Sequence, residues 1–125
     1  MIIGIGTDIL EIKRLEDALR ANKERFLGRF LTPEERNAAA ERGKAELSYC
    51  AGRWAAKEAV AKMLGTGIGK DCSFQDIIVR NQEKGAPEVF LRGAAEKKAA
   101  SLGIRKIFLS ISHEEHYCVA TAIGC

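Results

Sequence analysis

The sequence has little of what marks secreted, membrane-spanning or nucleic-acid-binding proteins. Aromatic residues make up 6% of its 125 residues, and 20 basic against 17 acidic side chains leave a formal net charge of only +3. That balance disfavours nucleic acid as a partner, and the scarcity of aromatic side chains disfavours a stacking surface for RNA. No stretch approaches the roughly 20 apolar residues that cross a bilayer. We therefore expect neither a membrane nor a nucleic acid as a partner.

The cysteines lack the spacing of a metal site or of a secreted disulfide framework. They form no CxxC pair, and no histidine is spaced to complete a zinc site. Their positions are Cys50, Cys72, Cys118 and Cys125. The N-terminus has no basic segment of a secretion signal and soon reaches Asp8. Together these features predict a reducing, cytoplasmic compartment.

The order of the predicted elements indicates an α+β fold in a single domain over residues 1–125. Strands are expected at residues 2–10, 76–80, 88–91, 104–112 and 117–123, and helices at 12–31, from 32 onward, at 45–64 and at 94–102. A capping box predicts the helix start at Thr32, since Pro33 suits the first helical position and Glu35 can cap in return. We expect a mainly antiparallel sheet, one long buried helix and several shorter helices.

The most informative segment is Trp54-Ala55-Ala56-Lys57-Glu58-Ala59-Val60-Ala61-Lys62. On a helical wheel it is apolar on two sides, which predicts burial against more than one element. Glu58 and Lys62 lie one turn apart on a stripe that also carries Trp54. Such a charged pair is costly in apolar surroundings unless it has partners. The alternative is an ordinary surface pair that adds about 0.3 kcal/mol to helix stability.

Asp8 is the second candidate, because it follows Gly4 and Gly6 in the first strand. Glycines in a strand allow another backbone or a ligand to come close, although an acid near a strand end can equally cap a helix. Asp8 and Glu58 would supply two hard oxygen ligands, and magnesium is usually held by one or two carboxylates, waters and substrate phosphates. Asp8, Glu58 and a Lys62 beside the same phosphates form the smallest set of charged groups that phosphoryl-type transfer needs.

Two further segments suggest a site. The glycine-rich turn at residues 65–69 could approach a phosphate, but it matches neither a Walker A loop nor a dinucleotide fingerprint. A flexible helix end is the alternative. His113, at the end of a predicted strand, is either a site residue or part of a structural turn. A serine hydrolase is disfavoured, because no GxSxG elbow accompanies His113.

Four segments together resemble the holo-[acyl-carrier-protein] synthases, the short bacterial-type group of the 4'-phosphopantetheinyl transferase superfamily. The segments are Gly6-Thr7-Asp8-Ile9 leading to Arg14, Trp54 to Lys62 followed by Gly65-Thr66-Gly67, Gly85-Ala86-Pro87, and Leu109-Ser110-Ile111-Ser112-His113. They stand in family order along essentially the whole chain.

The resemblance implies a 4'-phosphopantetheinyl transferase-like fold and the corresponding reaction. The enzyme would move 4'-phosphopantetheine from coenzyme A to a serine of apo acyl carrier protein, leaving adenosine 3',5'-bisphosphate, in support of fatty acid biosynthesis. By analogy, Asp8 and Glu58 hold magnesium and form the catalytic set with Lys62. The serine proton would pass to Glu58 or to a magnesium-bound water, and the sequence leaves this choice open.

The resemblance also implies binding residues and an assembly. Residues expected to bind coenzyme A are Arg53, Lys62, Gly65, Gly67, Pro87 and His113. Residues expected to attract the acidic carrier protein are Arg14, Arg20 and Arg25. The family is typically a homotrimer with active sites at subunit junctions. Two rival functions remain: a magnesium-dependent diphosphate or nucleotide hydrolase with the same catalytic residues, and a non-catalytic RNA-binding module, which the composition disfavours.

Overall fold

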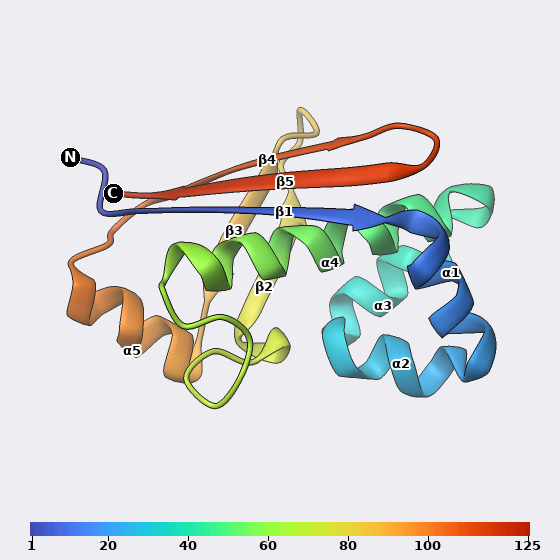
Figure 1. Cartoon of the computed structure of the whole chain (residues 1–125), viewed down its shortest axis with the longest axis horizontal. Coiled ribbons are helices and arrows are strands. Elements are labelled where there is room, and N and C mark those ends of the chain that lie inside the picture. The colour runs from blue at the N-terminus through green and yellow to red at the C-terminus, as the bar shows by residue number, and fades with distance from the viewer.

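A long central helix runs beneath a three-stranded sheet, with smaller helices at both of its ends (Figure 1). The computed structural model describes all residues from 1 to 125. Its elements are β1 (Gly4–Glu11), α1 (Ile12–Ala21), α2 (Lys23–Phe30), α3 (Pro33–Ala40), the 3-10 turn η1 (Gly43–Ala45), α4 (Glu46–Met63), the 3-10 turn η2 (Phe74–Asp76), β2 (Ile77–Asn81), β3 (Pro87–Leu91), α5 (Gly93–Leu102), β4 (Ile107–His113) and β5 (Tyr117–Gly124). The α+β class is confirmed. The strands form two antiparallel sheets, whereas we expected one.

The three-stranded sheet has the order β1-β5-β4, and the second sheet is the β2–β3 hairpin. Because successive side chains alternate between faces, the register divides the larger sheet into two sides. One row on the inner face pairs Asp8 with Ala120 and Ala120 with Ile111. A row on the outer face joins Ile9, Val119 and Ser112 in the same way. The inner face packs on α4.

Glycines in β1 allow this strand to touch the helix directly. A Cβ atom on Gly4 would lie 2.3 Å from the Met63 carbonyl oxygen, and one on Gly6 would lie 2.0 Å from the Ala59 carbonyl oxygen. Any side chain at either position would therefore clash with the backbone of α4. The predicted close approach at these glycines is confirmed, and the approaching group is another segment of backbone.

Helix α4 is buried on nearly all sides, as its two apolar faces predict. It contacts β1, β5 and β4 on one side and α1, α3 and β2 on others. Alanines line most of this surface and keep the neighbours close. Trp54 stacks on Phe26 at a centroid distance of 5.7 Å and also contacts Phe30 and Phe74. This aromatic cluster fastens α2 and η2 to the middle of α4.

The N-terminal helical segment differs from the single continuous helix that we expected. Asn22 has an extended backbone (φ −162°) and its side chain accepts a hydrogen bond from the Arg25 amide, so it ends α1 and caps α2. The predicted capping box at Thr32 is confirmed, with reciprocal bonds between Thr32 and Glu35. None of the helices combines the length and the apolar character needed to traverse a lipid bilayer.

Candidate functional site

A cavity of about 290 Å³ opens beside the N-terminal half of α4. Its walls come from α4, the segment after α3, the β2–β3 hairpin and the end of β4. The lining residues are Arg42, Ala45, Ser48, Tyr49, Gly52, Arg53, Asn81, Gly85, Pro87, Ile111 and His113. We call this cavity the cationic pocket, because it contains two arginines and no acidic side chain. The structure thus brings together Arg53, Pro87 and His113, three of the residues predicted to bind coenzyme A.

The two arginines of the cationic pocket lie against one tyrosine ring. The guanidinium carbon of Arg42 is 4.6 Å from the Tyr49 ring centroid, and that of Arg53 is 4.3 Å from it. Both distances are within the range of cation–π contacts. Arg53 is 6% exposed and donates from Nη2 to the Asn81 Oδ1 at 3.0 Å, while its buried Nε has no partner. An arginine held in this way can present further donors to a phosphate.

His113 closes the pocket from the sheet side. It is the last residue of β4 and belongs to the inner-face row with Cys118 and Leu10. Its Nε2 lies 3.4 Å from the Ser48 hydroxyl of α4, which orients the imidazole ring. The other ring nitrogen makes no hydrogen bond within the chain and is therefore available to a ligand.

Asp8 and Glu58 form a second feature, the carboxylate pair. Strand β1 runs antiparallel to α4, since Gly4 contacts Met63 and Gly6 contacts Ala59. Two residues of strand advance about 6.8 Å and four residues of helix about 6 Å. Continuing this match by one step brings Asp8, on the same inner face, to the turn of α4 that carries Glu58. The two carboxylates are therefore neighbours although 50 positions separate them in the chain.

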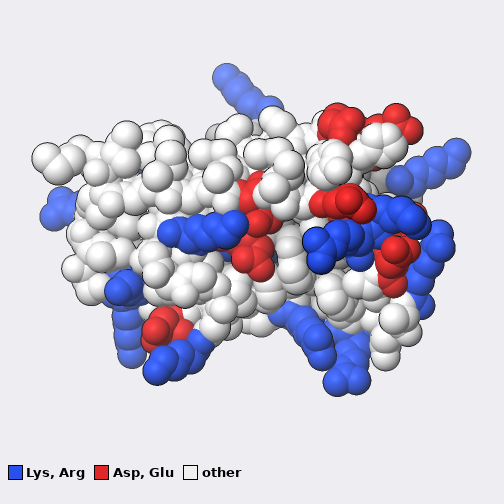
Figure 2. Space-filling model, in the orientation of Figure 1, with Lys and Arg blue, Asp and Glu red and all other residues white.

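The electrostatics of the carboxylate pair agree with this proximity. Burial raises the pKa of Glu58 above its ordinary value, and the Asp8 charge raises it further, while Lys62 opposes both effects. Lys62 Nζ lies 3.1 Å from Asp8 Oδ1 and 3.0 Å from the Thr7 carbonyl oxygen. One ammonium group thus partly neutralises two carboxylates. In Figure 2, acidic side chains gather near the middle of the face, with basic side chains on either side.

The donor set of the carboxylate pair suits a hard divalent cation. Nowhere in the chain do three or more His, Cys, Asp or Glu side chains converge as in a complete protein cage. Two carboxylates instead match the partial set that magnesium uses when substrate phosphates and waters complete its coordination. Burial and repulsion by Asp8 raise the pKa of Glu58, and both disfavour its charge until a cation is present to compensate it.

Gly65 and Gly67 lie away from the cationic pocket, at the C-terminal end of α4. Both have positive φ angles, +80° and +65°, and their amides close the helix on the carbonyls of Lys62 and Ala61. The distance from Arg53 to this turn is about 17 Å along the helix axis. A role for these glycines in binding coenzyme A stays a prediction, and within one chain they do not frame the same cavity as Arg53.

The basic N-terminal residues divide into paired and unpaired groups. Arg20 lies 3.7 Å from Glu16, so part of its charge is satisfied within α1. Arg14 and Arg25 are exposed and form no ion pair. Arg25 also borders a small hollow between α1 and α2 whose floor contains Phe26. Arg14 and Arg25, which form no ion pair, are therefore better suited than Arg20 to meet an acidic partner.

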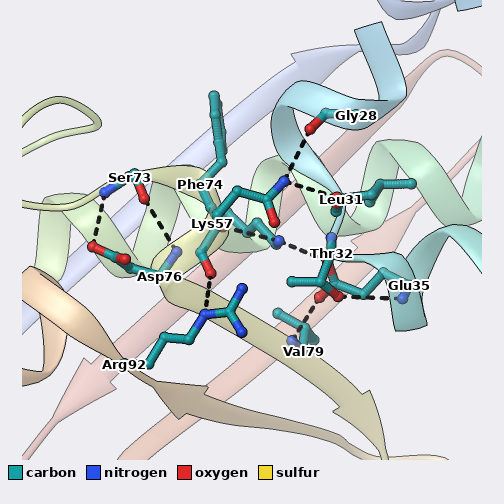
Figure 3. Close-up of polar contacts among 11 residues, drawn as sticks. Gly28, Leu31, Thr32, Glu35, Lys57, Ser73, Phe74, Asp76, Val79 and Arg92 are labelled. Atoms are coloured by element: carbon teal, nitrogen blue, oxygen red, sulfur yellow. Dashed lines mark hydrogen bonds and ion pairs between the residues drawn. The ribbon is translucent and has the colours of Figure 1, made fainter. Parts of the chain in front are cut away.

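A buried ion pair on the far side of α4 was not predicted from the sequence (Figure 3). Lys57 Nζ donates to Glu35 Oε1 at 2.7 Å and to the Phe74 carbonyl oxygen at 3.1 Å. Glu35 Oε1 also accepts from the Thr32 amide, and Oε2 accepts from the Val79 amide, each at 2.8 Å. Both side chains are at most 1% exposed. Burial lowers the pKa of Lys57, and the neighbouring carboxylate counteracts this effect.

Sequence patterns held a signal for some of the missed residues. Lys57 lies among alanines and Val60, so a charge there had to find a buried partner, and Glu35 had already been identified as a helix cap. Arg42, Tyr49 and Asn81 gave no comparable signal, because they come from three separate elements that meet only in the folded chain.

The chain is similar in sequence and in structure to known 4'-phosphopantetheinyl transferases. A sequence profile described as the 4'-phosphopantetheinyl transferase superfamily matches residues 4–122. The holo-[acyl-carrier-protein] synthase of Vibrio parahaemolyticus is 47% identical over 122 residues, covering 98% of this chain and 96% of the relative. The crystal structure of the Neisseria meningitidis synthase superposes with a TM-score of 0.92 at 41% identity, covering 99% and 98% of the two chains. The Bacillus anthracis synthase, solved in complex with CoA (3',5'-ADP), gives a TM-score of 0.83 at 41% identity, with 99% and 96% coverage.

Proposed function

Because the chain belongs to the 4'-phosphopantetheinyl transferase superfamily, we propose that it is a holo-[acyl-carrier-protein] synthase. It transfers 4'-phosphopantetheine from coenzyme A to a serine of apo acyl carrier protein and releases adenosine 3',5'-bisphosphate. The observation that carries the proposal is that one helix, α4, contributes both to the cationic pocket and to the carboxylate pair. Coenzyme A needs both, since its nucleotide carries a phosphate and its diphosphate is the reacting group.

The cationic pocket is the site for the adenosine 3'-phosphate end of coenzyme A. Arg42 and Arg53 supply positive charge without a competing carboxylate in the lining, and His113 adds a ring nitrogen. Pro87 and Gly85 present an apolar edge suited to a flat base. Arg53 and Glu58 are about 7.5 Å apart along α4 but about 140° apart around its axis, and the pocket lies at the β4 edge of the sheet whereas Asp8 lies in β1 at the other edge. Coenzyme A would therefore meet both features where two copies of the chain adjoin. The complex of the Bacillus anthracis relative with CoA (3',5'-ADP) supports this assignment.

Asp8 and Glu58 are the residues that would hold the magnesium ion of this reaction. When bound, the ion supplies charge neutralisation for the diphosphate and its leaving group. Lys62 already contacts Asp8 and the Thr7 carbonyl oxygen, and its long side chain can turn toward a phosphate oxygen. Both roles are electrostatic, which is the main contribution that proteins make to phosphoryl-type transfer.

Glu58 fits the role of ligand better than that of general base. Its pKa is raised by burial and by the Asp8 charge, and a cation between the two carboxylates removes the second cause. A carboxylate that holds the ion would be ionised and have little affinity for a proton, so Glu58 would act as a ligand and not as the base for the carrier-protein serine.

The carrier protein docks on α1 and α2. Arg14 and Arg25 are exposed and unpaired there, and acyl carrier proteins are acidic, so the two surfaces attract each other over a Debye length of about 8 Å. Strand β1 leads directly from Asp8 into α1. A carrier protein on this helix therefore delivers its serine close to the carboxylate pair.

The working unit is a homotrimer. The outer face of the three-stranded sheet is not covered by any element, and it carries large exposed apolar side chains: Ile5, Ile9, Phe108, Tyr117 and Val119. An apolar face of this kind is typical of an interface. Other copies of the chain cover it, in a cytoplasmic enzyme. Sedimentation velocity on Ile9→Lys tests the assignment: we expect smaller species than for the wild type, and an unchanged trimer would contradict this interface.

Intact-mass spectrometry tests the reaction itself. Apo carrier protein is incubated with the enzyme, coenzyme A and magnesium, and we expect it to gain the mass of one phosphopantetheine group. Chelation of the metal should abolish the gain. A parallel reaction without carrier protein follows release of adenosine 3',5'-bisphosphate. Rapid release there, with no modification of the carrier when it is present, would indicate a hydrolase and overturn the proposal.

A further inference from the structure

The buried Glu35–Lys57 pair connects α3 to two of the elements that build the cationic pocket, α4 and β2. Glu35 belongs to the first turn of α3, Lys57 to α4, and the Val79 amide that Glu35 accepts from belongs to β2. All of these contacts are shielded from water, with both side chains at most 1% exposed. The pair does not line the pocket, so it acts on any ligand only through the elements that it joins.

From the ion pair, a continuous path leads into the pocket. Val79 and Asn81 are two residues apart on β2 and therefore project from the same side of the strand. The Asn81 Oδ1 accepts from Arg53 Nη2 at 3.0 Å. Arg53 in turn lies one helical turn before Lys57 on α4. Glu35, Lys57, Arg53 and Asn81 thus join α4 to β2 at two levels, one deep in the core and one at the pocket.

The contacts between α4 and β2 also set the position of the β2–β3 turn, which supplies the apolar wall of the pocket. Asn81 is the last residue of β2 and pairs with Pro87, the first residue of β3. Gly85 and Pro87 line the cavity. Outside the core, the only side-chain ion pair between α3 and this hairpin is Glu34–Arg80, which is about half exposed and therefore weak. The buried pair is the stronger of the two restraints on the hairpin.

We propose that Glu35 and Lys57 are positioning residues for nucleotide binding, because they fix the β2–β3 hairpin, and with it Asn81 and Arg53, at the geometry that a phosphate requires. This inference rests on the proposed function, in which the cationic pocket receives coenzyme A. A buried ion pair is weak evidence for stability, since apolar residues of similar volume often stabilise as well. Retaining one here is explained by the directional bonds that it makes to two other elements.

Affinity for coenzyme A, measured by calorimetry, distinguishes a positioning role from a purely structural one. The double variant Glu35→Gln/Lys57→Met removes both charges together and so leaves no unpaired buried ion. We expect its Kd and KM for coenzyme A to rise about tenfold, as small misplacements of binding groups do. Its kcat should stay within about threefold of the wild-type value, because Gly6 and Ala59 still fix the helix beside Glu58.

Ile104→Ala provides the matched control. Ile104 is buried beside Gly124, at the end of α4 remote from the pocket, so its truncation lowers the melting temperature without a path to Arg53. We expect it to bind coenzyme A as the wild type does. If the double variant does the same, or if Ile104→Ala at equal loss of stability weakens binding equally, the pair has only a structural role and the inference is wrong.

Asn81→Ala keeps the inference testable even if the double variant does not fold. It leaves the ion pair intact and removes the link to Arg53, so binding of coenzyme A should weaken by a similar factor. Combined with Glu35→Gln/Lys57→Met, it should weaken binding no further, since residues on one path are not additive. Wild-type affinity in Asn81→Ala, or full additivity in the triple variant, would contradict the path. Failure of the wild type to bind coenzyme A would instead overturn the proposed function.

Discussion

The cationic pocket and the carboxylate pair share one helix and have opposite electrostatic characters. The pocket holds two arginines and no acid, and its ligand-facing groups are ready for an anion. In the carboxylate pair, burial and the Asp8 charge raise the pKa of Glu58, and a single lysine, Lys62, opposes both effects. The cationic pocket is preorganised to bind an anion, whereas the ionised form of the carboxylate pair is destabilised in the absence of a cation. Under the proposed function, this contrast assigns substrate affinity to the cationic pocket and catalysis to the carboxylate pair, a few turns apart on α4.

The two halves are also built in different ways. The carboxylate pair needs only one strand and one helix, which touch because glycines in β1 lie directly on the α4 backbone. The cationic pocket needs four chain segments, held together by the buried Glu35–Lys57 pair and the Asn81–Arg53 bond. Substitutions in the first half should therefore act locally, whereas the second half should respond to changes in the elements behind it.

The largest effect is expected at the carboxylate pair. Asp8→Asn and Glu58→Gln each remove a charge that the proposed function assigns to the metal, and we expect kcat to fall by about 10³-fold or more, as loss of electrostatic stabilisation does. Affinity for coenzyme A should change by less than about fivefold, because the pocket is untouched. Steady-state kinetics and calorimetry measure the two quantities separately. Near-normal turnover in either variant with magnesium present would show that this half has no catalytic role.

The next largest effect is expected in the cationic pocket, where a substitution should change KM for coenzyme A more than kcat. Arg53→Ala removes a buried phosphate donor from the pocket, so KM for coenzyme A should rise by about 10- to 100-fold, as loss of a charged hydrogen bond does. The kcat should change by only a few fold. Dephospho-coenzyme A provides the control, because it lacks the 3'-phosphate and should be affected much less by the substitution. Equal losses with both substrates would place Arg53 elsewhere on the ligand.

How far the sequence predicts this molecule follows from the same division. Local signals are strong where the partner is close in the chain, as for the capping box at Thr32, and they fixed most element boundaries to within a few residues. The Asp8–Glu58 pairing was predicted through a family resemblance and through glycines that signal close approach. The pocket residues Arg42, Tyr49 and Asn81 were missed, because their meeting depends on tertiary packing alone. The break at Asn22 was missed because Phe26 lies seven residues after Leu19, a spacing that one continuous helix would also give.

A smaller effect is expected on the carrier-protein surface. Arg25→Glu reverses an unpaired exposed charge on α2, and KM for the carrier protein should rise about three- to tenfold at low salt, through slower association. Added salt should shrink the difference, because screening weakens attraction between exposed charges. Kinetics at two ionic strengths measure this. Arg20→Glu, at a residue already paired with Glu16, should have less effect, and an equal effect would contradict the division of this cluster.

The smallest effect concerns stability and has a definite sign. Since the pKa of Glu58 is raised in the folded protein above its ordinary value of 4.5, the folded state binds this proton more tightly than the unfolded state. Stability is therefore lost as pH rises through the folded pKa. Glu58→Gln removes the ionisable group, so in metal-free buffer at pH 7 its melting temperature should exceed that of the wild type by about 1–3 °C. The difference should vanish below about pH 4, where Glu58 is protonated in both states.

Glu34 gives the opposite sign and completes this test. The Arg80 guanidinium lowers the pKa of the Glu34 carboxyl, so its contribution to stability is present at neutral pH and is lost as pH falls through the folded pKa. Glu34→Gln should therefore melt slightly below the wild type at pH 7 and approach it in acid. Thermal melts of both variants across pH compare the two glutamates directly. If Glu58→Gln behaved like Glu34→Gln, Glu58 would be stabilised by its surroundings, and the crowding that prepares the carboxylate pair for a cation would be absent.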